Sequence, residues 1–219
     1  MSDTASDQNS GMPSIAPSPG GVRVDRVVTS GTFELDGGSW DVDNNVWVVG
    51  DDEECLVIDA PHDIEAILGV VGTRRVVAIA CTHGHDDHVR FAPDLGHVTG
   101  APVLLNPAER EVWSLTHDQA PDGDLVDGQT IAVAGTTLQV IATPGHSPGG
   151  VCLYAPDLGV LFTGDTLFNG GPGATGRSFS DKDVLVASIR DRLFALPDET
   201  VVKTGHGDDT TLGAERANV

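Results

Sequence analysis

Residues 82–88 read THGHDDH, and this stretch decides how the rest of the chain is interpreted. Three histidines and two aspartates fall within six consecutive positions, directly after the apolar run RVVAIACT at 75–82. Imidazoles and carboxylates crowded at the end of a buried strand lose their hydration and repel one another unless a cation joins them. Both are suitable ligands for Zn²⁺, iron or Mn²⁺. The stretch therefore predicts a metal site rather than a solvated polar turn.

The spacing within the stretch divides the ligands into two groups. His83 and His85 are two positions apart, so in an extended segment their side chains point the same way. Asp87 and His88 are adjacent and diverge, so they are available to a second ion. We therefore expect two metal positions beside one loop.

Three later segments repeat the order of strand end, glycine and polar side chain. They are TPGHSPGG at 143–150, FTGDTLF at 162–168 and KTGHG at 203–207. A glycine beside the polar residue permits a tight turn and a close approach of the backbone. A single loop histidine is more often an ordinary surface residue, but the segments in this order indicate one shared site.

Short apolar runs separated by turn signals make up most of the remaining chain. Strands are expected within 22–28, 45–50, 55–60, 75–82, 101–106, 130–133, 137–143, 150–155, 159–164 and 200–205. Residues 62–71 and 181–194 have helical spacing, and further helices are expected from Asp86–Asp87 and over 107–115. Helices in both halves, between blocks of strands, predict an α/β fold of two mixed sheets with helices outside, an αββα sandwich.

The chain divides into a tail and one domain. Residues 1–20 (MSDTASDQNSGMPSIAPSPG) are rich in Ser, Pro, Gly and Asp, a composition typical of a disordered tail. We expect a single folded domain over 21–219, a length that buries a sizeable core without disulfides. Met12 is an alternative start to Met1.

The composition excludes several kinds of partner. Lysine and arginine total 12 against 33 aspartates and glutamates, a formal net charge of −21. Nucleic acids and anionic membranes are bound through cationic groups, so neither is expected. No apolar run approaches the ~20 residues that cross a bilayer, and we expect no signal sequence because the first cation is Arg23. Cys55, Cys81 and Cys152 form no disulfide framework. A cytoplasmic protein is therefore predicted.

The order HxHxDH (83–88), PGH (144–146), GD (164–165) and GH (205–206) resembles the metallo-β-lactamase superfamily, and within it the glyoxalase II branch. The resemblance covers nearly the whole chain from about residue 23. It implies that seven side chains hold two ions: His83, His85 and His146 the first, Asp87, His88 and His206 the second, and Asp165 both. Asp59 resembles the family's aspartate that braces the ligand loop without binding metal. The ions implied are divalent, with zinc expected and iron or manganese left open.

Departures from neighbouring branches narrow the resemblance. β-Lactamases of this superfamily have Cys or Ser where Asp165 stands, flavodiiron proteins have Glu where His85 stands, and lactonases place a tyrosine shortly after the bridging aspartate. The superfamily's tRNA-processing nucleases carry basic extensions, which disagree with the acidic composition. Two-domain glyoxalase II enzymes bind glutathione through a C-terminal helical domain, whose residues are not expected here. The stretch 164–181 is similar to single-domain hydrolases associated with mycothiol-dependent metabolism.

Three residues are candidate substrate contacts. Arg177 lies in the glycine-rich stretch after Asp165, and Phe168 follows the same aspartate. Trp40 belongs to the segment 31–44, which is expected to fold over the site with this tryptophan at its tip. A surface loop with an incidental arginine is an equal alternative for Arg177, and core or edge packing is an alternative for Trp40.

The resemblance implies a metal-dependent hydrolase that cleaves the thioester of a small thiol, S-acylglutathione or S-acylmycothiol. Asp87 and Asp165 are its catalytic carboxylates, holding ions whose bound hydroxide is the nucleophile. The alternatives are a persulfide dioxygenase with one iron, a lactonase or another hydrolase of the superfamily, and a metal-binding scaffold without catalysis. The expected partner is a small molecule, and the oligomeric state is left open.

Overall fold

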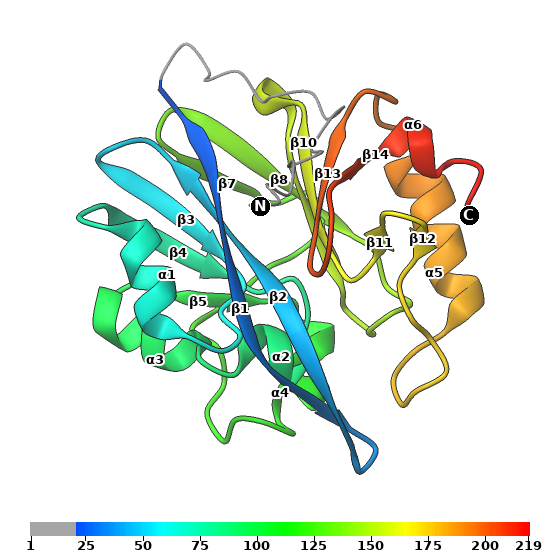
Figure 1. Ribbon diagram of the computed structural model, residues 1–219, viewed down its shortest axis with the longest axis horizontal. Coiled ribbons are helices and arrows are strands. Elements are labelled where there is room, and N and C mark those ends of the chain that lie inside the picture. Colours follow the sequence, from blue (N-terminus) through cyan, green and yellow to red (C-terminus); the bar gives the residue numbers. More distant parts are fainter. Residues whose placement is uncertain (1–20) are drawn as a thin grey trace, which may run out of the picture.

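Two six-stranded sheets pack face to face in the computed structural model, with helices on their outer faces (Figure 1). The structure describes residues 21–219, so the tail expected at 1–20 lies outside the described residues. The predicted αββα sandwich is confirmed, and both sheets are mixed as expected.

The first sheet comes from the N-terminal half of the chain. Its strands, in spatial order, are β1 (Arg23–Leu35), β2 (Gly38–Gly50), β3 (Glu54–Ile58), β4 (Arg75–Ala80), β5 (Val103–Leu105) and β6 (Gly123–Asp124). β1, β2 and β3 run antiparallel to one another, whereas β3 to β6 are parallel. Parallel strands place their carboxyl ends at one edge of the sheet, where loops gather.

The second sheet comes from the C-terminal half. Its strands, in spatial order, are β14 (Thr210–Thr211), β13 (Val201–Thr204), β10 (Val160–Gly164), β9 (Val151–Ala155), β8 (Thr136–Ala142) and β7 (Thr130–Val133). Only the β10–β13 pair is parallel. A small ribbon of β11 (Leu167–Phe168) and β12 (Gly171–Pro172) follows β10.

Helices cover both outer faces. The first sheet carries α1 (Ile64–Val71), α2 (Asp86–Val89), α3 (Ala92–Thr99) and α4 (Arg110–Trp113), and the second carries α5 (Lys182–Ser188) and α6 (Leu212–Glu215). Short 3₁₀ turns lie at Pro107–Glu109 and Pro156–Leu158. The helix expected over 181–194 lies where predicted, but it continues as a π-helical turn over Ile189–Leu193.

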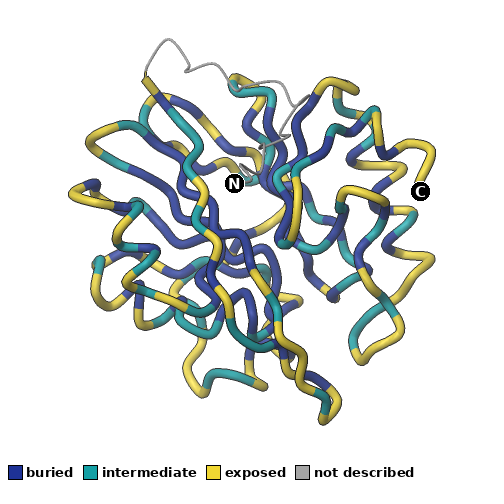
Figure 2. Tube along the Cα trace, in the orientation of Figure 1, coloured by how far each residue is buried: buried dark blue, intermediate teal, exposed yellow. Residues whose placement is uncertain are grey.

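Strand side chains alternate between two hydrophobic layers. In β3, Leu56 and Ile58 point into the layer between the sheets, whereas Cys55 and Val57 point toward the helices α1 and α3. A third cluster joins the second sheet to α5. Both faces of the central strands are therefore buried, as Figure 2 shows, which explains their continuous apolar sequences.

The segment 31–44 differs from the expectation. It forms the far end of the β1–β2 hairpin, whose turn is Asp36–Gly37. Trp40 is therefore not at the tip but three residues into β2, where it pairs with Phe33. The reason is the Asp-Gly-Gly sequence, which supports the positive φ angles of a tight hairpin turn.

Candidate metal centre

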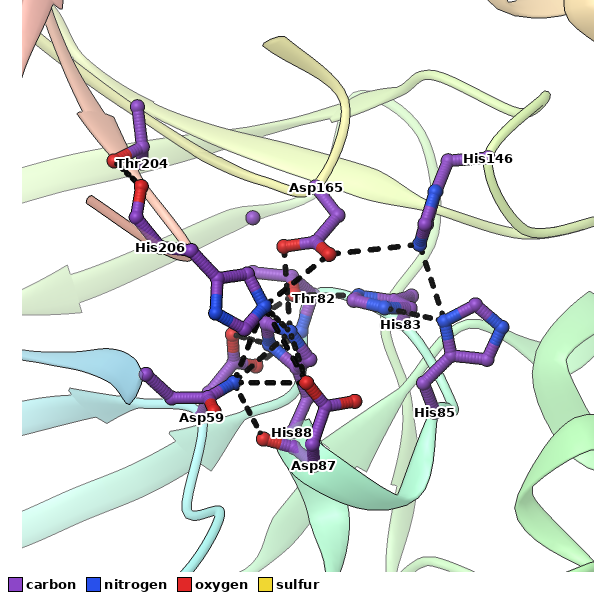
Figure 3. A network of polar contacts seen from close by, with 12 residues as sticks. Asp59, Thr82, His83, His85, Asp87, His88, His146, Asp165, Thr204 and His206 are labelled. Atoms are coloured by element: carbon purple, nitrogen blue, oxygen red, sulfur yellow. Dashed lines mark hydrogen bonds and ion pairs between the residues drawn. The ribbon is translucent and has the colours of Figure 1, made fainter. Parts of the chain in front are cut away.

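All seven expected ligands lie at one edge of the sandwich, beyond the carboxyl ends of strands; Asp87 and His88 lie in the short helix α2 and the other five in loops. The THGHDDH stretch follows β4 as a loop that leads into α2, and three loops of the second sheet face it. His146 follows β8, Asp165 follows β10 and His206 follows β13. Figure 3 shows their side chains pointing toward one another. The topology thus brings together residues separated by more than a hundred positions.

The first group consists of three imidazoles. Nδ1 of His85 lies 3.0 Å from Nε2 of His83 and 3.1 Å from Nε2 of His146. A tetrahedral zinc ion with bonds of about 2.0–2.1 Å requires its nitrogen ligands to be roughly 3.3 Å apart. These nitrogens are therefore spaced as one ion would require.

The second group combines imidazoles and carboxylates. Nε2 of His206 lies 3.3 Å from Nε2 of His88 and 3.3 Å from Oδ2 of Asp87. Asp165 reaches both groups, because its Oδ2 lies 3.4 Å from Nε2 of His206 and 3.6 Å from Nε2 of His146. Its other oxygen lies 3.3 Å from His88. The expected bridging position of Asp165 agrees with this geometry.

The two histidines that follow strands of the second sheet are held by main-chain carbonyls. His146 donates from Nδ1 to the carbonyl oxygen of Ala174 at 2.8 Å, and His206 donates from Nδ1 to that of Asp43 at 2.8 Å. A carbonyl oxygen only accepts, so the proton is on the outer nitrogen. Nε2 of each ring therefore faces the site, and in the neutral ring this nitrogen carries the lone pair that binds a metal.

The carboxylate of Asp59 orients two further rings, that of His88 directly and that of His83 through Thr82. Its Oδ2 accepts from Nδ1 of His88 at 2.8 Å and from the hydroxyl of Thr82 at 2.9 Å, and its Oδ1 accepts from the main-chain N–H of Thr82 at 2.7 Å. The Thr82 hydroxyl lies 3.0 Å from Nδ1 of His83. The structure therefore places Asp59 behind the ligands, as expected.

The electrostatics of the two groups differ. Burial lowers the pKa of His85 to about 3, and the neighbouring His146 adds to the decrease. Burial also acts to lower the pKa of His206, but the carboxylates of Asp165 and Asp87 raise it to about 10. His85 thus offers a neutral imidazole to the first group, whereas the second group concentrates negative charge that stabilises a cation. Together, this donor set fits two divalent ions.

Glu109 is a site residue that sequence analysis missed. It is fully buried, and its carboxylate accepts from the main-chain N–H of Gly84 at 2.7 Å, from the hydroxyl of Ser147 at 2.5 Å and from the N–H of Gly149. It therefore ties the loop of the first sheet to the loop that carries His146. Nothing in its local sequence marks it, because its partners are 25 to 40 residues away.

A cavity of about 330 Å³ opens above the ligands. Its lining residues are Phe33, Trp40, Val42, Asp43, His85, Asp87, His146, Asp165, Ala174, Arg177 and His206. The Arg177 guanidinium stacks 4.1 Å from the ring centre of Trp40 and 5.1 Å from that of Phe33. The glycine-rich loop and the hairpin thus form the cavity mouth together.

Phe168 has a different position. Its ring centre lies 6.1 Å from that of His206, but it is not one of the described residues that line the cavity. A substrate contact at Phe168 therefore stays a prediction. Two histidines outside the ligand set have ordinary positions: His117 donates to the carbonyl of Val89 at 2.9 Å, and His97 is exposed.

The comparisons with known proteins agree with this geometry. A family model described as the metallo-beta-lactamase superfamily matches residues 40–206, which include all seven expected ligands. The chain belongs to the metallo-beta-lactamase superfamily. An uncharacterized protein of Aquifex aeolicus (strain VF5) is 36% identical over 187 residues, covering 79% of this chain and 89% of the relative.

Solved structures of superfamily proteins share the fold. BLEG-1, described as a B3 metallo-beta-lactamase, is 30% identical with a TM-score of 0.74, covering 85% of this chain and 95% of that chain. TTHA1623, solved in a di-iron-bound form, is 34% identical with a TM-score of 0.70, covering 81% and 94%. ETHE1 from Myxococcus xanthus, at 24% identity and a TM-score of 0.69 over 88% and 82%, shows the fold alone.

The family assignment supports an enzyme, since the fold is of the metallo-hydrolase type and the His/Asp cluster can bind metal. Within residues 21–219, no helix combines the length and the apolar character needed to span a bilayer.

Proposed function

We propose that this superfamily member is a metal-dependent thioesterase that acts on the acyl derivative of a small thiol, as in the glyoxalase II branch. One observation carries the proposal: the cavity floor consists of histidine and aspartate ligands, and among its described lining residues there is no serine, cysteine, lysine or tyrosine. The cavity therefore offers neither a side-chain nucleophile of the usual kinds nor an ammonium or phenol to protonate a leaving group. A thiolate leaves without such help.

Two divalent ions would act as Lewis acids and lower the pKa of a water molecule from about 16 to about 7. The chain's own residues prepare that chemistry by holding the ligand lone pairs inward. Asp87 and Asp165 supply the negative charge that retains the ions, and Asp165 spans both groups. Zinc is the proposed metal, and the likeness to TTHA1623 in its di-iron form makes iron the main alternative.

Arg177, Trp40 and Phe33 are the proposed substrate contacts at the mouth. A guanidinium held flat against aromatic rings keeps its N–H edges free for a carboxylate or for hydroxyl oxygens. Glutathione offers carboxylates and mycothiol offers hydroxyl groups, so both thiols are candidates. We place the reaction in the cytoplasm, in keeping with three free, buried cysteines.

The experiment that tests the function is steady-state hydrolysis of S-lactoylglutathione and of an S-acylmycothiol by metal-loaded protein. His85→Ala, which removes one ligand of the first group, is the control. Turnover of either thioester that disappears in the control supports the proposal. Two bound ions without hydrolysis of either substrate would overturn it.

Persulfide oxidation by a mononuclear iron site is the second candidate, and iron in TTHA1623 is the observation that favours testing it. Iron content and oxygen uptake with a persulfide distinguish this candidate from a hydrolase. One iron per chain with stoichiometric oxygen consumption would replace the thioesterase proposal.

A further inference from the structure

Asn44, on β2, touches three ligands of the second metal position although it belongs to none of the ligand loops. The side chain is fully buried. Its amide nitrogen lies 3.1 Å from Oδ2 of Asp87, 3.3 Å from Nε2 of His88 and 3.4 Å from Nε2 of His206. These are the same three atoms that face the second position. Among the described contacts of Asn44, none reaches His83, His85 or His146.

The orientation of the Asn44 carboxamide is determined from both sides. Its nitrogen donates to the main-chain carbonyl of Asp87 at 2.7 Å, and a carbonyl can only accept. Its oxygen accepts from Nε2 of His62 at 2.9 Å. Rotating the carboxamide by half a turn would set its oxygen against the Asp87 carbonyl and carboxylate, so the nitrogen stays toward the ligands.

His62 is itself held in place by close packing. A Cβ at Gly31 would overlap the His62 ring, so the glycine allows β1 to press directly against it. The contacts thus run from β1 through His62 and Asn44 to Asp87, in the first turn of α2. This chain of contacts gives His62 a specific role in holding Asn44.

We propose that Asn44, held by His62, is a positioning residue that sets the affinity of the second metal position and leaves the first unchanged. The inference rests on the proposed function only in requiring the two metal positions. An amide nitrogen cannot bind a cation, but its N–H groups can hold a ligand carboxylate in one orientation. The first position is held by other groups, Thr82 and the carbonyl of Ala174.

The expected effect is selective. Loss of an outer partner of a metal ligand typically reduces metal affinity about 10–100-fold. Asn44→Ala should therefore weaken binding of the second ion by about that factor and leave the first ion bound as in the wild type. His62→Leu, which keeps the amide but removes its donor, should weaken the second ion less. His62→Gln, which restores an N–H donor, should recover wild-type binding.

The test is a Zn²⁺ titration of metal-free full-length protein in competition with a chromophoric chelator, repeated with Co²⁺ to follow the absorption of each position. Asn169→Ala is the matched control, because Asn169 is exposed and its side chain contacts only the carbonyl of Asp209 among the described hydrogen bonds. Thermal unfolding of each metal-free variant reports on folding separately.

Selective loss of the second ion in Asn44→Ala, with recovery in His62→Gln, supports the inference. Unchanged binding of the second ion in both Asn44→Ala and His62→Leu would overturn it, and so would an equal loss of both ions. If Asn44→Ala fails to fold, the two His62 variants decide the question. A wild-type chain that binds fewer than two ions would overturn the two-metal proposal itself, whereas two ions without thioesterase turnover would leave this inference standing.

Discussion

Glu109, outside the ligand set, accepts hydrogen bonds from three different donors. Burial raises its pKa, and the hydrogen bonds from Ser147, Gly149 and Gly84 oppose that increase. Because it accepts from two separate loops, its removal would leave buried donors without partners. Each unsatisfied buried donor costs about 1–3 kcal/mol.

Glu109→Ala should therefore lower the free energy of unfolding of the metal-free protein by about 3 kcal/mol or more, measured by urea denaturation. Glu111→Ala, an exposed glutamate two positions along, is the control and should change it by less than about 0.5 kcal/mol. An equal free energy of unfolding for the two variants would show that the three hydrogen bonds of Glu109 contribute no net stability.

Arg177 permits a prediction about binding alone. It stacks on Trp40 and Phe33 beside the cavity but lies outside the ligand set. Arg177→Met should raise KM for an anionic thioester about tenfold or more, because a charge-assisted hydrogen bond contributes about 1.5–3 kcal/mol. The kcat should change little, and so should KM for an uncharged thioester. A loss confined to kcat would contradict a role in substrate binding.

For individual residues, the sequence identifies the expected metal ligands more readily than the residues that hold those ligands in place. The seven ligands stand in short motifs that each contain a glycine, so they are visible without tertiary information. Asn44 and Glu109 are not, because what defines them is contact with loops far along the chain. The one available signal for Asn44 was an asparagine pair at the start of the apolar run 45–50.

Among the structural elements, α5 supports the loop that carries His146. Gly145 has φ of 135°, and a Cβ there would overlap the main chain of Leu185 in the first turn of α5. The N–H of Asp181, the residue that caps α5, donates to the carbonyl of Gly145 at 2.7 Å. The loop and the helix therefore pack backbone to backbone, with no room for a side chain.

Gly145→Ala should destabilise the protein by about 3 kcal/mol or more, since the strain of a positive φ adds to steric overlap. It should also weaken binding of the first metal ion. Gly100→Ala is the control, because Gly100 has φ of 70° with nothing within 4 Å of its Cβ position. In Gly100→Ala only the backbone strain should lower the free energy of unfolding, by about 1–2 kcal/mol. Urea denaturation and metal titration of both variants provide the measurement.

Most elements were predictable because their hydrophobic periods are regular. A helix was predicted from Asp86–Asp87 with no end assigned, and the structure divides this region into α2 and α3 (Ala92–Thr99), whose Pro93 and Gly96 reduce local helix propensity. Its formation depends on burying Leu95 against the first sheet, which is a tertiary effect. The position of Trp40 was misjudged for a similar reason, because the hairpin continues the β1–β2 pairing well beyond its apolar part.

In the whole molecule, the metal centre joins the two halves of the sandwich. The first half supplies four ligands from the loop after β4 and the helix α2 that follows it, and the second sheet supplies the other three from three loops. Direct contacts between the halves also exist near the site, including the N–H of Asn45 to the carbonyl of Gly205 at 2.8 Å and that of Val151 to Thr82 at 2.9 Å. Bound ions would add to this connection.

Metal removal should therefore lower the stability of the entire fold. An ion that binds only the folded chain, present at 1,000 times its dissociation constant, stabilises that chain by about 4 kcal/mol. For a chain of this size, 1 kcal/mol shifts Tm by about 2–4 °C, so chelation should lower Tm by roughly 8–16 °C. His85→Ala should show a smaller shift on chelation, because one ligand of the first group is missing. Differential scanning calorimetry with and without chelator measures both. Identical Tm values for the loaded and the chelated wild-type protein would show that the loops hold their geometry without ions and that the two sheets are joined by protein contacts alone.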